Sequence, residues 1–129
     1  MSEVPVELKF LSSHEWVLIE DNVATIGVSD HAQELLGDLV YVELPEQGST
    51  IAAGDSVVLI ESVKADSDTN AQVSGEVIEV NDEIDGAQEI INNDPYGDGW
   101  MYKVAMEDPE EVESLLEAEA YMEVIADEE

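Results

Sequence analysis

Lys64 is the residue of this sequence whose type and surroundings best suit covalent chemistry. The chain has three lysines, Lys9, Lys64 and Lys103, and no arginine. Lys9 and Lys103 lie within strand-like runs, where a lysine is ordinarily a solvated side chain on a snorkelling stem. Lys64 instead follows the apolar run 57–60 and precedes the polar stretch 65–70. This pattern predicts a strand that leads into an exposed turn carrying Lys64.

The spacing of glycines places that turn at the tip of a hairpin. Gly54 opens a strand-length segment about ten residues before Lys64, and Gly75 opens another about ten residues after it. A lysine amine in water has a pKa near 10.4 and is protonated at neutral pH. A catalytic base is therefore disfavoured. An exposed tip suits an amine that a ligase must reach and an acyl arm that must later swing.

The charge balance excludes several classes of partner. Asp and Glu number 33 against 3 Lys plus Arg, which gives a formal net charge of −30. Nucleic acids and anionic membrane surfaces would be repelled, so neither is an expected partner. Two interpretations of the acidity remain open, a solubilising surface and electrostatic steering toward basic docking surfaces on partner enzymes.

Other absences narrow the chemistry further. The chain has no cysteine, and its two histidines, His14 and His31, are far apart in sequence. We therefore expect no disulfide, no cysteine nucleophile and no metal site. A length of 129 residues suits a single domain, here 1–129. The sequence has neither a membrane-length apolar run nor a secretory signal, which predicts a soluble intracellular protein.

Short strands separated by turn residues must position Lys64. Asp21-Asn22 predicts a hairpin turn, and Pro45 ends a run of alternating apolar residues. Many short strands with regularly spaced turns indicate a mainly β sandwich or barrel. The strands are expected at Leu8 to Phe10, Glu15 to Ile19, Ala24 to Val28, Val40 to Leu44, Val57 to Val63, Asp68 to Val73, Glu76 to Val80 and Trp100 to Ala105.

Two helices are expected beside these strands. A short one near 29–36 has Ser29 as its N-cap and Gly37 as its stop. A C-terminal one near 109–125 has Asp108 as its cap and Pro109 in its first turn. Its apolar positions recur near one face, which predicts packing on the β-core.

Several segments of the sequence together match the pattern of one known family: Ser13 to Trp16, Ala24 to Val28, Asp30 to Asp38, Val42 to Pro45, Glu61 to Asp68, Val73 to Val77, Asn93 to Tyr96 and Gly99 to Met101. Through these segments, over nearly the whole chain, the sequence resembles the H protein of the glycine cleavage system. The segment around Lys64 alone is shared with lipoyl domains of acyltransferases, whereas the N-terminal segments and the terminal helix single out the H protein.

This resemblance implies a barrel-sandwich hybrid with two small antiparallel sheets and a lipoyl hairpin at about 55–80. It implies lipoic acid bound covalently to Lys64 as N6-lipoyllysine, attached by a lipoate ligase or lipoyltransferase. It further implies a carrier that is not itself an enzyme. Three partners would be visited: a pyridoxal-phosphate glycine decarboxylase that loads an aminomethyl group, a tetrahydrofolate-dependent aminomethyltransferase, and a flavin dihydrolipoyl dehydrogenase that reoxidises the dithiol.

The family also implies a cleft into which the loaded arm folds. Carried over, its lining residues are Ser13, Glu15 and Asp68, with His31 as a weaker candidate. A carboxylate can pair with an amine there, and a closed cleft excludes water. The resemblance places the protein in the cytoplasm if it is bacterial and in the mitochondrial matrix if it is eukaryotic. The chain departs from the family at Gln72, where proline is usual, and at Gly86 to Gln88, where Ser-Pro is common.

Two alternatives to this function stay open. One is an H-like carrier that relays lipoyl groups to other complexes. The other is an acidic β-domain that binds partners without any lipoyl group. A biotinyl carrier is disfavoured, because biotin lysines are typically flanked by methionines, and Val63 and Ala65 flank Lys64.

Overall fold

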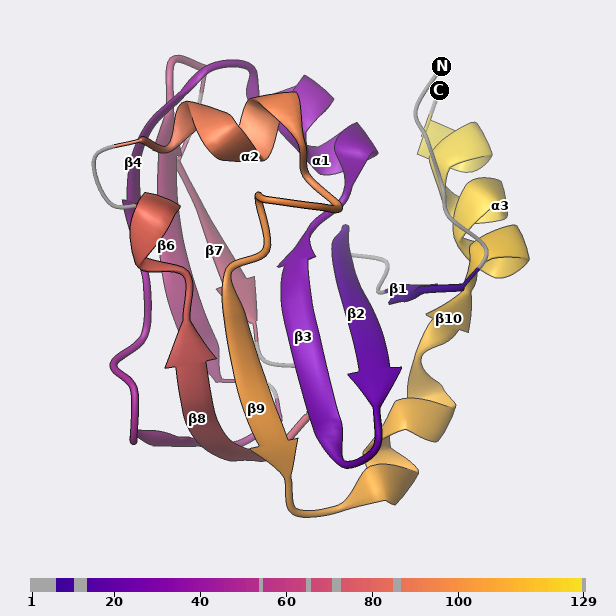
Figure 1. Ribbon diagram of the computed structural model, residues 1–129. Helices are drawn as coiled ribbons and strands as arrows, with labels where there is room; N and C mark the ends of the chain where they lie inside the picture. The colour runs from indigo at the N-terminus through magenta and orange to yellow at the C-terminus, as the bar shows by residue number, and fades with distance from the viewer. Residues whose placement is uncertain are drawn as a thin grey trace.

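Two antiparallel sheets form the body of the protein in a computed structural model (Figure 1). The structure describes residues 7–10, 14–53, 55–64, 66–70, 73–84 and 87–128, and at 66–70, 109, 112, 114 and 128 the backbone alone. One sheet has the order β10-β1-β2-β3-β9-β8-β5 and the other β4-β6-β7. The strands are β1 Lys9–Phe10, β2 Glu15–Glu20, β3 Val23–Val28, β4 Leu39–Glu43, β5 Thr50–Ile51, β6 Ser56–Ser62, β7 Asp66–Asn70, β8 Gly75–Val80, β9 Tyr102–Met106 and β10 Leu116–Glu117.

The predicted mainly β, barrel-sandwich hybrid architecture is confirmed, with one sheet larger than expected. The short strands β10, β1 and β5 extend the larger sheet to seven strands. The predicted hairpin at Asp21-Asn22 joins β2 to β3, and Asp21 has a left-handed φ of 56°. β7 begins two residues before its predicted start, and β9 begins two residues after its own. None of the described helices is long and apolar enough to cross a membrane.

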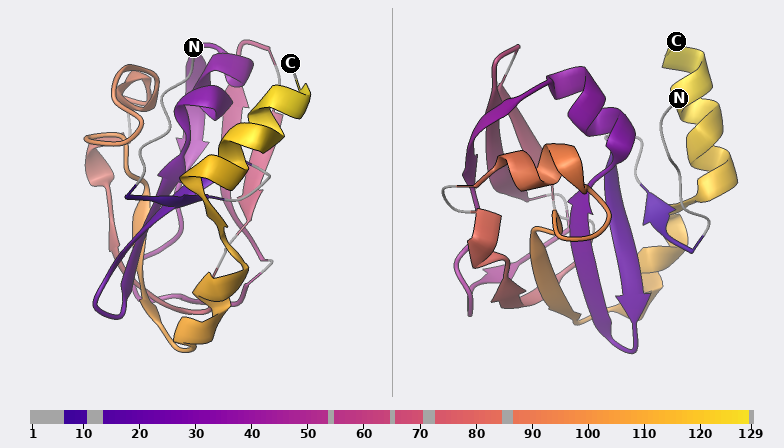
Figure 2. Two further views of the ribbon diagram at one scale, coloured as in Figure 1. Left: turned by 90° about the vertical axis from the view of Figure 1, so that its right-hand side faces the viewer. Right: turned by 45° about the horizontal axis from the view of Figure 1, so that its top comes forward.

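The short helix α1, Asp30–Leu36, has the predicted caps. The Ser29 side chain accepts a hydrogen bond from the Ala32 N–H at 3.1 Å. Gly37 ends the helix with φ 74° and ψ −154°, and its N–H donates to the Gln33 carbonyl. Glycine is required there because this backbone conformation is closed to residues with a Cβ. A second short helix, α2 Glu89–Asn93, was not predicted and lies beside α1 (Figures 1 and 2).

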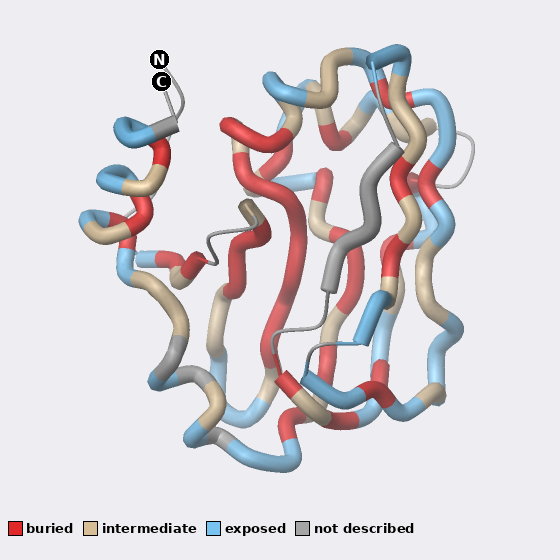
Figure 3. The backbone as a smooth tube through the Cα atoms, turned by 180° about the vertical axis from the view of Figure 1, so that it is seen from behind, coloured by how far each residue is buried: buried red, intermediate tan, exposed pale blue. Residues whose placement is uncertain are grey.

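The core divides into two apolar clusters on opposite faces of the larger sheet. Side chains alternate along β2, so Val17 enters the main cluster between the sheets while Trp16 enters a second one. The second cluster packs Phe10 and Trp16 against Tyr121 and Ile125 of the C-terminal helix α3, Ala118–Glu128. Figure 3 shows buried backbone running through the central strands and exposed backbone on the outer turns of α3.

The C-terminal segment differs from the predicted single helix at 109–125. It forms a 3₁₀ helix at Pro109–Ser114, the strand β10 and then α3. Asp108 does cap the first turn, since its Oδ1 accepts the Glu110 N–H at 3.0 Å. The helix breaks because β10 pairs with the edge strand β1, with Phe10 opposite Leu116. Pairing satisfies backbone groups that an open sheet edge would leave exposed, and this tertiary gain overrides the helical pattern.

Candidate functional site

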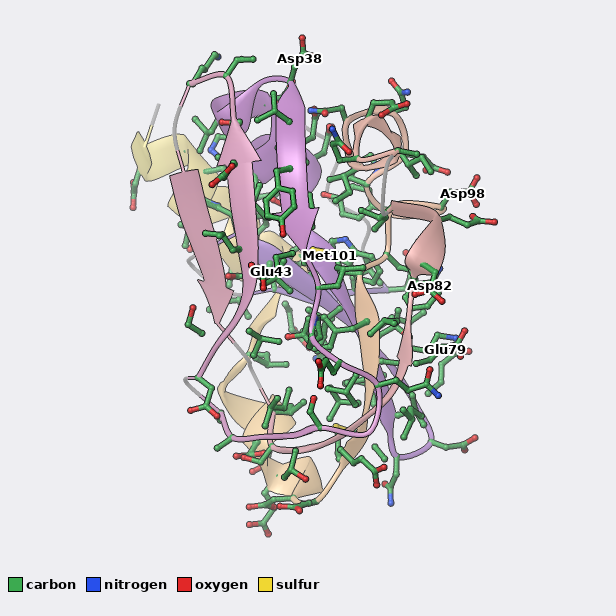
Figure 4. All side chains as sticks on the ribbon, turned by 90° about the vertical axis from the view of Figure 1, so that its left-hand side faces the viewer. Asp38, Glu43, Glu79, Asp82, Asp98 and Met101 are labelled. Carbon is green, nitrogen blue, oxygen red and sulfur yellow. The ribbon has the colours of Figure 1, made fainter. Side chains whose placement is uncertain are left out.

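Lys64 lies at the tip of the hairpin formed by β6 and β7. The strands pair up to Glu61 opposite Asp66, and Lys64 is exposed in the turn between them. The Lys64 N–H donates to the Ser62 hydroxyl at 3.3 Å. Figure 4 shows this hairpin turning beside Asp38, at the end of the molecule that carries α1 and α2. The sequence-based prediction of a lysine on a hairpin tip is thus confirmed for the backbone of the described residues.

The tip rests on the turn that follows α1. The Val63 N–H donates to the Asp38 carbonyl at 3.0 Å, which joins the hairpin to this turn. A Cβ added to Gly37 would lie 3.2 Å from Lys64 Cε and 3.5 Å from Lys64 Cδ. The aliphatic stem of Lys64 therefore lies across a bare backbone position. We call residues 37–39 the lysine seat.

A buried polar cluster lies at the opposite end of α1. The Tyr121 hydroxyl is 2.6 Å from Ser29 Oγ and 2.8 Å from His14 Nδ1. The His14 and His31 ring centroids are 4.9 Å apart, although the sequence separates these residues widely. We call His14, Ser29, His31 and Tyr121 the His–Tyr cluster. It joins the N-terminal region, α1 and α3 through side chains.

Two further polar groups are buried near the start of β2. Glu15 is 2% exposed and Tyr102 is completely buried. Burial first, and the Glu15 carboxylate second, raise the pKa of the Tyr102 hydroxyl above its ordinary value. That hydroxyl has no hydrogen-bond partner among the described residues. Buried acids are rare, so the burial of Glu15 distinguishes it from the exposed carboxylates of the chain.

The structure brings together some of the predicted arm-binding residues and leaves others open. Glu15 and His31 are both buried, and Glu15 follows His14, whose ring is tilted against that of His31. Ser13 lies outside the described residues. Asp68 pairs with Leu59 in the backbone of the lysine hairpin, and its side chain is not described. α1 separates the lysine seat from the His–Tyr cluster by about 10 Å, the length of its seven residues.

Sequence reasoning missed the residues that anchor α1 from a distance. Tyr121 is 92 residues from Ser29, and Tyr96, whose hydroxyl accepts the Asp30 N–H at 2.9 Å, is 66 residues from Asp30. No local pattern relates such pairs. The only available signal was that a tyrosine at an apolar position of a helix seeks a partner for its hydroxyl.

Comparison with known proteins gives one consistent family. The model of the glycine cleavage H-protein family matches residues 8–128. A glycine cleavage system H protein of Alcanivorax borkumensis is 54% identical over 121 residues, which cover 94% of each chain. One of Stenotrophomonas maltophilia is 54% identical over 129 residues, covering 99% of this chain and 98% of the relative. The crystal structure of such a protein from Mycobacterium marinum superimposes with a TM-score of 0.89 at 37% identity, covering 95% and 99% of the two chains.

Proposed function

The chain belongs to the glycine cleavage H-protein family, and from this premise we propose that Lys64 carries the lipoyl group through which it acts. As a member of this family it is a lipoyl carrier protein of the glycine cleavage system. The observation that supports Lys64 is its position, exposed at a hairpin tip with its stem on Gly37. Lys9 and Lys103 are instead engaged by Glu117 at 3.1 Å and Glu79 at 3.8 Å.

The geometry of the tip fits a lipoyl group in amide linkage. Lys64 is exposed and lies in a turn, so its amine is accessible to a modifying enzyme. When bound, the lipoyl group supplies a disulfide that takes up the aminomethyl group of glycine and two electrons. Lys64 itself contributes a flexible stem, and the lysine seat fixes where that stem begins. The chain's own chemistry is therefore presentation, which fits a carrier that catalyses no step alone.

Glu15 and His31 complete this proposal as groups that receive a loaded arm. Glu15 offers a carboxylate that is 2% exposed, and a buried carboxylate pairs strongly with an amine. His31 lies on α1, at the end away from Lys64. Burial around both residues excludes water, which protects a group that water would hydrolyse. We extend the proposal to Ser13 and Asp68 on the family resemblance alone.

The proposed partners follow from the same family. They are a glycine decarboxylase, an aminomethyltransferase, a dihydrolipoyl dehydrogenase and the enzyme that attaches lipoate. The net charge of −30 favours basic docking surfaces on them, because opposite charges speed encounter. The relatives compared are bacterial, which supports a cytoplasmic location.

The mass of the intact protein tests the attachment site. Protein from lipoate-replete cells that contain a lipoate ligase should gain one lipoyl group, and Lys64→Arg should abolish the gain. The Lys103→Arg variant is the control and should gain the group as usual. A gain of one lipoyl group by the Lys64→Arg variant would contradict the assignment. The absence of any gain by the unaltered protein would contradict it as well.

Reconstitution separates this function from the two alternatives. With glycine decarboxylase, the lipoylated protein should support exchange of bicarbonate into glycine, and Lys64→Arg should not. A lipoylated protein without exchange would favour a relay carrier. A binding module without lipoate predicts that Lys64→Arg changes nothing.

A further inference from the structure

One amide side chain holds the turn on which the lysine hairpin rests. Asn92 lies in α2 and is half-buried. Its Nδ2 donates to the Gly37 carbonyl at 2.8 Å, and its Oδ1 accepts the Leu39 N–H at 3.1 Å. Nδ2 also lies 3.2 Å from Gln33 Oε1 of α1. Asn92 thus bonds to both ends of the lysine seat and to the helix that precedes it.

The turn to which Asn92 bonds is itself hydrogen-bonded to the hairpin tip. Asp38 lies between Gly37 and Leu39, and its carbonyl accepts the Val63 N–H at 3.0 Å. The first of them, Gly37, is the residue across which the Lys64 stem lies. The carbonyl groups at the end of a helix have no partner within it, so a displaced Asn92 would leave this turn to rearrange. The tip would lose its fixed support at the same time.

We propose that Asn92 is a positioning residue for Lys64: by holding the lysine seat, it sets where the hairpin tip presents its amine. The proposal rests on the proposed function of Lys64 as the attachment site. The Asn92 amide supplies a donor for one of these backbone groups and an acceptor for the other on the same short side chain. A modifying enzyme gains from a substrate held in the competent geometry, because an incompetent fraction raises the apparent dissociation constant.

Gln88 provides a matched control on the same segment. It precedes α2 as its N-cap residue, and its Nε2 donates to the Val40 carbonyl at 2.8 Å. It therefore joins α2 to β4 through an amide, as Asn92 does, but its side-chain hydrogen bond goes to Val40 and not to residues 37–39. Asn92→Asp and Gln88→Glu make the same change, since each replaces an amide by a carboxylate of equal shape. Each adds one negative charge and sets an oxygen against a backbone carbonyl.

The first experiment measures lipoylation of the full-length apo protein by a purified lipoate ligase. Asn92→Asp should raise the KM for the protein about tenfold and leave kcat unchanged, because loss of a hydrogen bond lowers the competent fraction by about that factor. Gln88→Glu should change KM less than twofold. An equal rise in both variants, or a change in kcat alone, would overturn the proposal.

Amide hydrogen exchange of the same apo proteins tests the seat without any modification. The Val63 amide should exchange about tenfold faster in Asn92→Asp and at its usual rate in Gln88→Glu. This result does not depend on whether Lys64 is the attachment site, which the mass of Lys64→Arg decides separately. Unaltered protection of Val63 in Asn92→Asp would show that Asn92 does not hold the tip.

A second pair of variants keeps the test valid if Asn92→Asp does not fold. Gly37→Ala places a Cβ against the Lys64 stem, whereas Gly48→Ala places one in open space, and both residues have positive φ, 74° and 92°. Gly37→Ala should raise the ligase KM several-fold and Gly48→Ala should not. A rise of the same size in both would assign the effect to general backbone strain and overturn the proposal.

Discussion

The two ends of α1 are held in opposite ways. At its start, the His–Tyr cluster joins side chains that are mostly buried, and Tyr121 stacks on Phe10 with ring centroids 4.5 Å apart. At its end, the lysine seat is held through backbone groups, and the Lys64 side chain that rests on it is exposed. The first arrangement stabilises the fold. The second leaves the Lys64 side chain accessible while it fixes the backbone on which that side chain rests.

This difference separates stability from presentation. A buried aromatic contributes several kcal/mol, because its removal leaves a cavity. An exposed lysine contributes little, and its substitution leaves the core intact. Variants at the buried end should therefore change unfolding and not modification, whereas Lys64→Arg should change modification and not unfolding.

The largest effect is expected for Tyr121→Ala. Tyr121 is completely buried and packs in the second apolar cluster, so truncation should lower the free energy of unfolding by about 3–5 kcal/mol. Urea unfolding followed by tryptophan fluorescence measures this. Met122→Ala, on the same helix but 46% exposed, is the control and should cost less than about 0.5 kcal/mol.

Modification of the folded Tyr121→Ala protein tests the separation itself. At a temperature where the variant is folded, its ligase KM should match that of the unaltered protein. A raised KM would mean that the two ends of α1 are coupled, and the comparison would fail.

A smaller effect is expected for Tyr121→Phe. This change keeps the ring and removes the hydroxyl that lies 2.6 Å from Ser29 Oγ and 2.8 Å from His14 Nδ1. Ser29 and His14 would each lose this contact, which should lower the free energy of unfolding by about 1–3 kcal/mol. A cost below the error of urea unfolding would show that these two contacts do not stabilise the cluster.

Alkaline pH should lower the free energy of unfolding through Tyr102. Its pKa is raised, by burial first and by Glu15 second, so the folded chain keeps a proton that the unfolded chain loses near pH 10. The stability that this raised pKa contributes is fully present below that pH and is lost above it, at about 1.4 kcal/mol per pH unit. Urea unfolding between pH 9 and 11, roughly the window around the ordinary tyrosine pKa, measures the slope.

The Tyr102→Phe variant should show a flatter loss of stability with pH. The Tyr102 hydroxyl that it removes has no hydrogen-bond partner among the described residues, so at neutral pH the change should lower the free energy of unfolding by less than about 1 kcal/mol. Tyr41→Phe, at a site 45% exposed, should leave the steep slope in place. Equal slopes for the Tyr102→Phe and unaltered proteins would assign the pH dependence to other groups.

The smallest effect is expected for Lys9→Gln. Lys9 Nζ lies 3.1 Å from Glu117 Oε1, and the two side chains are 37% and 79% exposed. Surface ion pairs of this kind contribute about 0–1 kcal/mol and weaken with salt. Unfolding at low and high salt should differ by no more than this between the variant and the unaltered protein. A larger loss would mean that β1 and β10 depend on the ion pair to stay together.

Local signals predicted the lysine end of α1 better than the buried end. Ser29 and Gly37 marked the helix, and the change from apolar to polar residues marked the turn at Lys64, because caps and turns depend on neighbours in sequence. The His14–His31 contact could not be predicted in this way, because the two residues are far apart in sequence.

The C-terminal region shows why other parts of the fold could not be predicted from the sequence. The periodicity of 109–125 is helical, yet residues 116 and 117 pair with β1, more than 100 positions away. The choice between helix and strand there depends on an open sheet edge that only the fold creates. Asn92 was missed for the same reason, since it bonds to residues 53 and 55 positions before it.

The mass of a protein in which Lys64 is the only lysine tests the central claim most directly. Lys9→Arg and Lys103→Arg combined leave Lys64 as the single lysine of the chain. After treatment with lipoate ligase, the account predicts a gain of one lipoyl group, as in the unaltered protein. A folded double variant that gains none, while the unaltered protein gains one, would place the attachment site elsewhere and contradict the account.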